Sequence, residues 1–159
     1  MRALTMTQPW AMLVATKENR IETRSWGTSY RGPLAIHAAR GFPDDARELC
    51  AASPYRRTLA AAGYRNADDL PRGAVIAVAR LVDVMRFERT TLRDVRARAA
   101  RGELPRHEWE FGDFSAGRFG LVLEEVRMLS DPIPARGMLG LWTVPPPLER
   151  AIEAQLARI

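Results

Sequence analysis

The stretch TQPWAMLVATKENRIETRSWGTSYRGPLAIHAAR, Thr7–Arg40, contains the patterns that decide the expected fold. Thr7-Gln8-Pro9 is typical of a helix start, because a hydroxyl or amide side chain can cap a free N–H of the first turn and proline is tolerated there. A short apolar helix is predicted for residues 9–16, and residues 19–25 then alternate between two faces. A second strand is predicted for Leu34–Ala38. The stretch therefore predicts a helix followed by two strands.

Three motifs of this stretch and one later block carry a family resemblance. They are Gln8–Trp10, Ile21–Trp26, Tyr30–Ala38 and the pair Phe111–Phe119 with Gly140–Trp142. Together they resemble the ASCH family, small barrels related to the PUA domains that bind RNA. The resemblance implies an α+β fold, a PUA-like closed mixed β-barrel of about five to six strands with peripheral helices. It implies one domain over residues 1–159.

The family signature Gly-x-Lys-x-x-Glu-x-Arg is only half kept. Glu22 and Arg24 match it, whereas Asn19 stands at the lysine position and Lys17 at the glycine position. In family members resembling the amidohydrolase of acetylcytidine, that lysine is catalytic and a threonine replaces the glutamate. We therefore expect no release of acetate from acetylcytidine by this protein.

The rest of the chain supplies the remaining strands. Ala74–Val84 is almost continuously apolar, which is typical of a strand buried on both sides, so we expect it at the centre of the barrel. Arg118–Leu129 is predicted to be a long strand and Leu139–Val144 the last one. The segment between these two strands, Asp131–Gly137, contains Pro132 and Pro134 and is therefore predicted to be a rigid connection.

Three helical regions are expected around the barrel. Phe42–Gly63 is predicted to form two helical pieces interrupted at Pro54. The arginine-rich helix predicted for Thr91–Gly102 has two interpretations, a solvated face or an arm that follows phosphates. The C-terminal helix that starts at 145–147 is predicted to pack on the barrel or on a second copy of the chain, giving a homodimer.

Composition limits the function classes. The formal net charge is +5, and Lys17 is the only lysine among 24 basic residues. This arginine excess favours anionic partners, although a codon bias would also produce it. No apolar run approaches the roughly 20 residues of a membrane span, and the single cysteine, Cys50, suits a cytoplasmic protein. Two histidines and one cysteine exclude a Cys/His zinc site, and no motif predicts a cofactor.

The candidate site residues cluster in and near the opening stretch. Trp10 and Trp26 are candidates to stack on an unpaired base, and amides and carboxylates suit recognition of base edges. Each also has a structural interpretation, a packed tryptophan or an internal ion pair. The predicted nucleic-acid-binding residues are Gln8, Trp10, Asn19, Glu22, Arg24, Trp26, Tyr30, Arg31, His37, Arg40 and Arg118.

The leading hypothesis is a protein that binds RNA, single-stranded nucleic acid or a modified nucleotide in a cleft built from the first helix and the two strands after it. One alternative is a nucleic-acid-directed hydrolase, a nucleoside amidohydrolase or a ribonuclease, with Lys17, Glu22 or His37 as catalytic candidates. A lysine at a helix-to-strand turn is expected to be exposed, which weakens its candidacy. The other alternative is a protein-interaction module.

Overall fold

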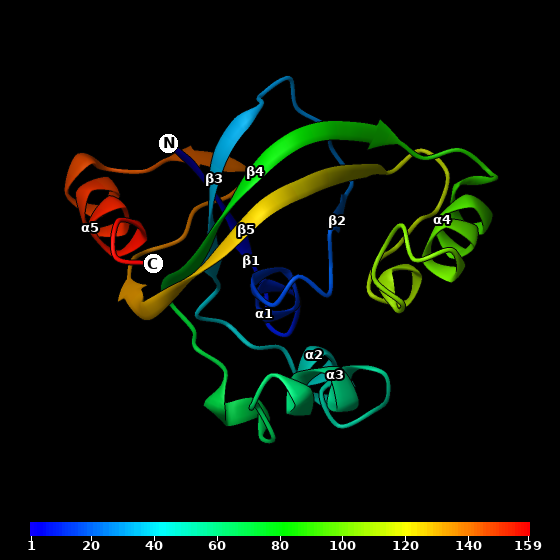
Figure 1. Cartoon of the computed structure of the whole chain (residues 1–159), viewed down its shortest axis with the longest axis horizontal. Coiled ribbons are helices and arrows are strands. Elements are labelled where there is room, and N and C mark those ends of the chain that lie inside the picture. Colours follow the sequence, from blue (N-terminus) through cyan, green and yellow to red (C-terminus); the bar gives the residue numbers. More distant parts are fainter.

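A computed structural model describes residues 1–159 as a six-stranded sheet with five α-helices and two 3-10 turns (Figure 1). In chain order the elements are β1 Arg2–Met6, α1 Trp10–Ala15, β2 Ile21–Arg24, β3 Gly32–Ala38, α2 Asp44–Leu49, α3 Tyr55–Ala61, η1 Ala67–Asp69, β4 Ala74–Arg86, α4 Thr91–Ala100, η2 Glu108–Glu110, β5 Phe119–Pro134, β6 Leu141–Thr143 and α5 Pro146–Leu156. No helix is long and apolar enough to cross a membrane.

The sheet is an open half-barrel, so the prediction of a closed barrel was wrong. Its strand order is β2-β5-β4-β3-β1-β6, with β1 and β3 parallel and every other pair antiparallel. No ladder joins β2 to β6. These two edge strands have four and three residues, against 13 and 16 for β4 and β5, so they offer few backbone groups with which to close the sheet. A seam therefore separates β2 from β1 and β6, and the α+β class and the mixed sheet are confirmed.

The apolar run was predicted correctly as the central strand. β4 lies between β3 and β5, and Ala74–Ala79 are all buried. The expected rigid connection after β5 was wrong, because β5 continues to Pro134 and pairs Ile133 with Val75. Beyond Val122 no strand pairs with the other side of β5, where Gln155 of α5 bonds both backbone groups of Asp131, and an edge without a strand partner tolerates proline.

Helix α1 fills the inside of the half-barrel. Five of its six residues are buried, and it contacts β1, β3, β4, β5 and α3. Its side chains belong to a core cluster of 21 buried residues that spans the sheet. Because α1 is surrounded by strands, the residues at its two ends, Trp10 and Thr16, are held at the openings of the half-barrel.

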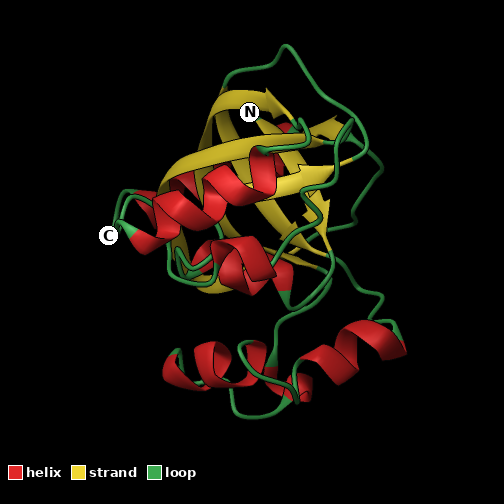
Figure 2. Ribbon diagram, turned by 90° about the vertical axis from the view of Figure 1, so that its right-hand side faces the viewer, coloured by secondary structure: helices red, strands yellow, loops and turns green.

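The other helices lie at the margins of the sheet. Figure 2 shows α2 and α3 below it, at one end of the half-barrel. Helix α5 packs on β5 through the buried Ile152, as predicted for packing on the barrel. Helix α4 packs against η2 through Val95, and its Arg96 stacks over the Trp109 ring at 4.4 Å.

Candidate nucleic-acid interface

A pocket of about 370 Å³ opens between α1, β2, α3 and the turn after η2, and we call it the acidic pocket. Its aromatic wall consists of Trp10, Tyr55 and Phe111. The Trp10 and Tyr55 ring centroids are 6.2 Å apart at 85°, and those of Tyr55 and Phe111 are 4.9 Å apart at 62°. Edge-to-face packing of this kind fixes the rings, so the half-buried Trp10 presents a rigid surface to the pocket.

Three carboxyl groups line the same pocket: Glu22, Glu110 and Asp113. His107 Nδ1 lies 2.6 Å from Glu110, and the backbone and hydroxyl of Ser115 donate to Asp113. The Ser115 bonds hold the pKa of Asp113 below its usual range. No cluster of three or more His, Cys, Asp or Glu side chains has a geometry that could hold a metal ion. The pocket contains no arginine among its lining residues.

Glu22 is the carboxyl group of the pocket that β2 contributes. Burial raises its pKa, while the guanidinium groups of Arg24 and Arg118 oppose that rise. Its Oε1 accepts a bond of 3.1 Å from Arg24 Nε. Its Oε2 accepts no bond within the protein and is not fully buried, so it is free to accept one from a ligand.

Arg24 crosses the seam of the half-barrel. Besides binding Glu22, it donates from Nη2 to the carbonyl of Thr5 on β1 at 3.0 Å. Its guanidinium also lies 6.0 Å from the ring centroid of Trp26. One side chain therefore connects β2 to β1 where no backbone ladder does, through its Nε and Nη2 groups.

Glu108 supports the pocket from outside it, and the sequence analysis did not single it out. It is fully buried, and its carboxyl group accepts the backbone N–H bonds of Arg20 at 2.8 Å and of Ile21 at 2.8 Å. Oriented to donate, the Asn19 amide lies 2.8 Å from Glu108 Oε1. Burial raises the pKa of Glu108 to about 7, against the opposing effect of the Arg20 and Ile21 bonds. Glu108 thus fixes the entry to β2, the strand that carries Glu22.

The two predicted amides lie inside the fold. Gln8 has no exposed surface; its Oε1 accepts the Met12 N–H at 3.0 Å and its Nε2 donates to the Pro71 carbonyl at 2.8 Å. The helix start expected at Thr7-Gln8-Pro9 is therefore confirmed, and the Gln8 amide is the side chain that caps it. Asn19 is 1% exposed and bound to Glu108. Both amides position the pocket's walls rather than face it.

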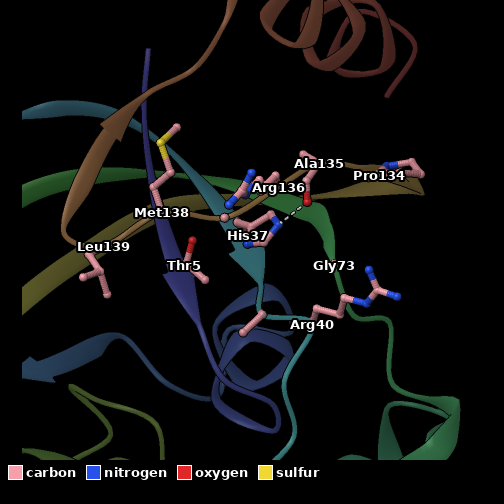
Figure 3. A pocket seen from close by; sticks show the side chains of 11 residues that line it. Thr5, His37, Arg40, Gly73, Pro134, Ala135, Arg136, Met138 and Leu139 are labelled. Carbon is pink, nitrogen blue, oxygen red and sulfur yellow. Dashed lines mark hydrogen bonds between the residues drawn. The ribbon is translucent and has the colours of Figure 1, made fainter.

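A second and larger pocket, of about 820 Å³, lies at the end of β1 and β3 beside the segment that joins β5 to β6. We call it the arginine pocket, because Arg40 and Arg136 line it and no carboxyl group does. Figure 3 shows Met138 and Leu139 on one side and Arg40 on the other, with His37 between them. His37 is 1% exposed, its Nε2 lies 2.7 Å from the Ala135 carbonyl, and its Nδ1 has no partner. Burial lowers the pKa of His37, against the opposing effect of the Ala135 bond.

The structure therefore separates residues that we expected around one mouth. Trp10 and Glu22 line the acidic pocket, His37 and Arg40 line the arginine pocket, and Arg31 lines a shallow hollow near Asp83. The half-buried Trp26 and Tyr30 line neither of the two pockets. The single cleft divides in this way because β2 and β3 are not neighbours: β5 and β4 lie between them.

Two further candidates have distinct positions. Arg118 lies beside the acidic pocket, with Nε 3.4 Å from Asp113 Oδ2. Lys17 is exposed, as expected, and lines a different hollow with Arg20 and Glu124. Its φ of 67° is a left-handed conformation, which is the physical reason that glycine suits this place in the family signature.

Comparisons with known proteins agree with this fold. The ASCH domain model matches residues 4–129. Activating signal cointegrator 1 from Mus musculus is 34% identical over 82 residues, which cover 52% of this chain but only 14% of the mouse protein.

Two solved structures of ASCH from Zymomonas mobilis have the same architecture. The first has a TM-score of 0.55 at 11% identity, covering 96% of this chain and 93% of that one. A point variant of the same protein gives 0.56 at 12% identity, covering 96% and 94%. At such identities the likeness concerns the fold alone. Because the family model matches most of the chain, the protein belongs to the ASCH domain family.

Proposed function

We propose that this ASCH protein binds RNA or another single-stranded nucleic acid and takes one unstacked base into the acidic pocket. The observation that carries the proposal is that the Trp10 ring and the free Oε2 of Glu22 line the same pocket. The aromatic wall offers a stacking surface, and stacking of a base is worth about 1–3 kcal/mol.

The charges of the pocket favour a base rather than a phosphate. Glu22, Glu110 and Asp113 would repel a phosphate, whereas a carboxylate oxygen accepts bonds from the amino group of a base such as cytosine. Uracil offers a carbonyl oxygen at the corresponding place, which two carboxylate oxygens do not favour. The pocket is therefore suited to a base with hydrogen-bond donors on its edge.

The positions of the catalytic candidates support binding over hydrolysis. Glu22 and His37 line different pockets, so they do not form an acid–base pair. Lys17 lies in neither pocket, and Asn19, at the lysine position of the signature, is bound to Glu108. The resemblance to ASCH domains, which are associated with RNA binding, supports the same reading.

The experiment compares Trp10→Ala with Trp26→Ala in binding to a fluorescent RNA octamer at low salt. Trp10→Ala should weaken binding by about 1–3 kcal/mol, which is roughly 5- to 150-fold. Trp26→Ala is the matched control, since Trp26 is also half-buried but lines neither pocket. Circular dichroism checks that both variants fold. Binding of Trp10→Ala at the affinity of the unmodified protein, or no binding by the unmodified protein, would refute the base pocket.

A second arm tests the role of Glu22. The unmodified protein should prefer oligocytidine over oligouridine, and Glu22→Gln should reduce that preference by about 1–3 kcal/mol. An unchanged preference would remove Glu22 from base recognition while leaving Trp10 in place.

A further inference from the structure

The arginine pocket contains positive charge that nothing in the protein neutralises. Arg40 and Arg136 are both exposed, and neither guanidinium makes an ion pair or a hydrogen bond. By contrast, Arg24 and Arg118 beside the acidic pocket lie 3.1 and 3.4 Å from carboxylates. Free guanidinium groups without a nearby carboxylate are the chemistry that binds phosphate oxygens.

The segment that carries Arg136 is held firmly on the sheet. His37 Nε2 lies 2.7 Å from the Ala135 carbonyl, directly before it. Directly after it, Gly137 packs so closely that a Cβ there would lie 2.6 Å from Thr5 Oγ1 and 2.8 Å from the His37 ring. These contacts anchor both flanks of Arg136, so its guanidinium projects from a fixed base (Figure 3).

Arg40 is supported from a different element. Arg72 Nη1 donates to the Arg40 carbonyl at 3.3 Å, and the Arg72 guanidinium lies 5.8 Å from the Phe42 ring centroid. This places a third positive charge next to the pocket. Positive charge therefore lies on two sides of the pocket, at the end of β3 and on the segment after β5.

The opposite wall of the pocket is apolar and open to solvent. Met138 is 51% exposed and Leu139 is 98% exposed. Large apolar side chains at a loop tip beside free arginines match a ligand with a charged part and an apolar part. A nucleotide unit, with its phosphate and its sugar and base, has that composition.

The two pockets are neighbours across the seam. Thr5 lines the arginine pocket, and its carbonyl accepts a hydrogen bond from the Arg24 guanidinium. The same guanidinium binds Glu22, which lines the acidic pocket. One guanidinium group therefore separates a wall of one pocket from a wall of the other. This shared contact places the two pockets close enough for us to consider one ligand that occupies both.

We propose that the arginine pocket binds a phosphodiester of the same strand whose base enters the acidic pocket. This inference rests on the proposed function and extends it, because it assigns the backbone and the base to different pockets. Arg40 and Arg136 contact the phosphate oxygens, and Met138 and Leu139 contact the adjacent sugar or base. His37 and Gly137 are positioning residues.

The test measures the affinity for a single-stranded octamer as a function of salt. Each phosphate contact contributes about 0.7 to the slope of log K against log salt for single strands, so Arg40→Ala/Arg136→Ala should lower that slope by about 1.4. Arg150→Ala/Arg158→Ala removes the same charge from two exposed arginines of the C-terminal region that line neither pocket, and its slope should stay that of the unmodified protein.

The outcomes separate the two proposals. An unchanged slope in the Arg40/Arg136 double variant, or the same decrease in the Arg150/Arg158 control, overturns the phosphate assignment. Trp10→Ala should lower affinity at every salt concentration with the slope intact; if it has no effect while the double variant loses slope, the phosphate pocket stands and the base pocket fails. Cytidine monophosphate is the probe for a free nucleotide. Binding of it as tightly as the octamer would overturn the assignment to a strand backbone.

Discussion

The acidic and arginine pockets lie on either side of one seam and have opposite chemistry. The acidic pocket has three carboxyl groups and three aromatic rings, whereas the arginine pocket has two free guanidinium groups and an apolar rim. The net charge of +5 gives no hint of this division. The difference teaches that an arginine-rich composition does not identify where phosphate binds, because several of these arginines form ion pairs with the protein's own carboxylates, such as Glu22 and Asp113.

The two pockets also differ in how they are built. The acidic pocket depends on a buried carboxyl group outside it, Glu108, whose partners Arg20 and Ile21 are 88 and 87 residues away. The arginine pocket depends on close packing of Gly137 against Thr5 and His37. Buried polar groups cost stability when a partner is lost, while close packing costs stability when volume is added. The variants below exploit that contrast.

Glu108→Ala should have the largest effect. It leaves the buried N–H groups of Arg20 and Ile21 without acceptors, at about 1–3 kcal/mol each, so we expect the free energy of unfolding to fall by about 2–6 kcal/mol. Denaturant titration measures the loss. Glu103 is an exposed glutamate between α4 and η2, so Glu103→Ala should leave the free energy of unfolding near that of the unmodified protein. Equal stability of the two variants would mean that the acidic pocket does not depend on Glu108.

The next largest effect should be a pH dependence of stability that comes from Glu108, the residue that supports the acidic pocket. The pKa of Glu108 is raised to about 7 from an ordinary value of 4.5, so the folded state holds this proton more tightly than the unfolded state. The bound proton of Glu108 therefore contributes fully to the free energy of unfolding below about pH 4.5. This contribution is lost as the pH rises to about 7, a change of up to roughly 3 kcal/mol.

Glu108→Gln provides the reference, because a glutamine does not titrate. The difference in unfolding free energy between the unmodified protein and Glu108→Gln should shift against the unmodified protein between pH 4.5 and 7. A difference that stays constant across this range would show that burial does not raise the pKa of Glu108.

Gly137→Ala should affect the arginine pocket alone. The new methyl group meets Thr5 Oγ1 and the His37 ring at under 3 Å, so we expect a loss of about 1–3 kcal/mol in unfolding free energy and a lower salt slope of nucleic-acid binding. Gly41→Ala is the matched control, since nothing lies within 4 Å of its added methyl group. If Gly137→Ala instead abolishes the preference for cytidine, the two pockets are not separate in function.

Lys17→Gly should have the smallest effect, and a stabilising one. Lys17 has a φ of 67°, which glycine adopts without steric cost, so the free energy of unfolding should rise by about 0.5–1 kcal/mol. Because Lys17 lies in neither pocket, affinity for RNA should not change and acetylcytidine should release no acetate. If the unmodified protein releases acetate and Lys17→Gly does not, Lys17 is catalytic and the assignment of Lys17 to a position outside the site is wrong.

The sequence predicted those parts of the fold that local patterns determine. The apolar run of β4, the helix break at Pro54 and the helix start at Thr7-Gln8-Pro9 each depend on a few adjacent residues. Closure of the barrel does not, because it requires two edge strands to meet, and here both are short. The prolines of β5 gave the wrong prediction of a connection for a similar reason. A strand edge without a strand partner tolerates proline, and no local sequence pattern shows which strand has such an edge.

The candidate site was predictable in its residue types and less so in its geometry. Trp10 and Glu22 were placed together from their positions on α1 and β2, and the structure does bring them to one pocket. His37 was placed with them because it follows closely in sequence, yet β5 and β4 separate its strand from β2. Glu108 was missed because its partners are far along the chain. A glutamate inside an aromatic-rich turn was the only signal available.

The position of β1 between β3 and β6 has a consequence for how the chain folds. β1 and β3 are close in sequence and can form their parallel ladder early, but Arg2 and Thr143, which pair across β1 and β6, are 141 residues apart. Topologies rich in such distant pairings fold slowly, on the scale of milliseconds to seconds. Until β6 arrives, the outer edge of β1 offers unpaired backbone groups to any other extended chain. Three residues, Leu141–Thr143, thus protect a nascent domain from joining the wrong strand.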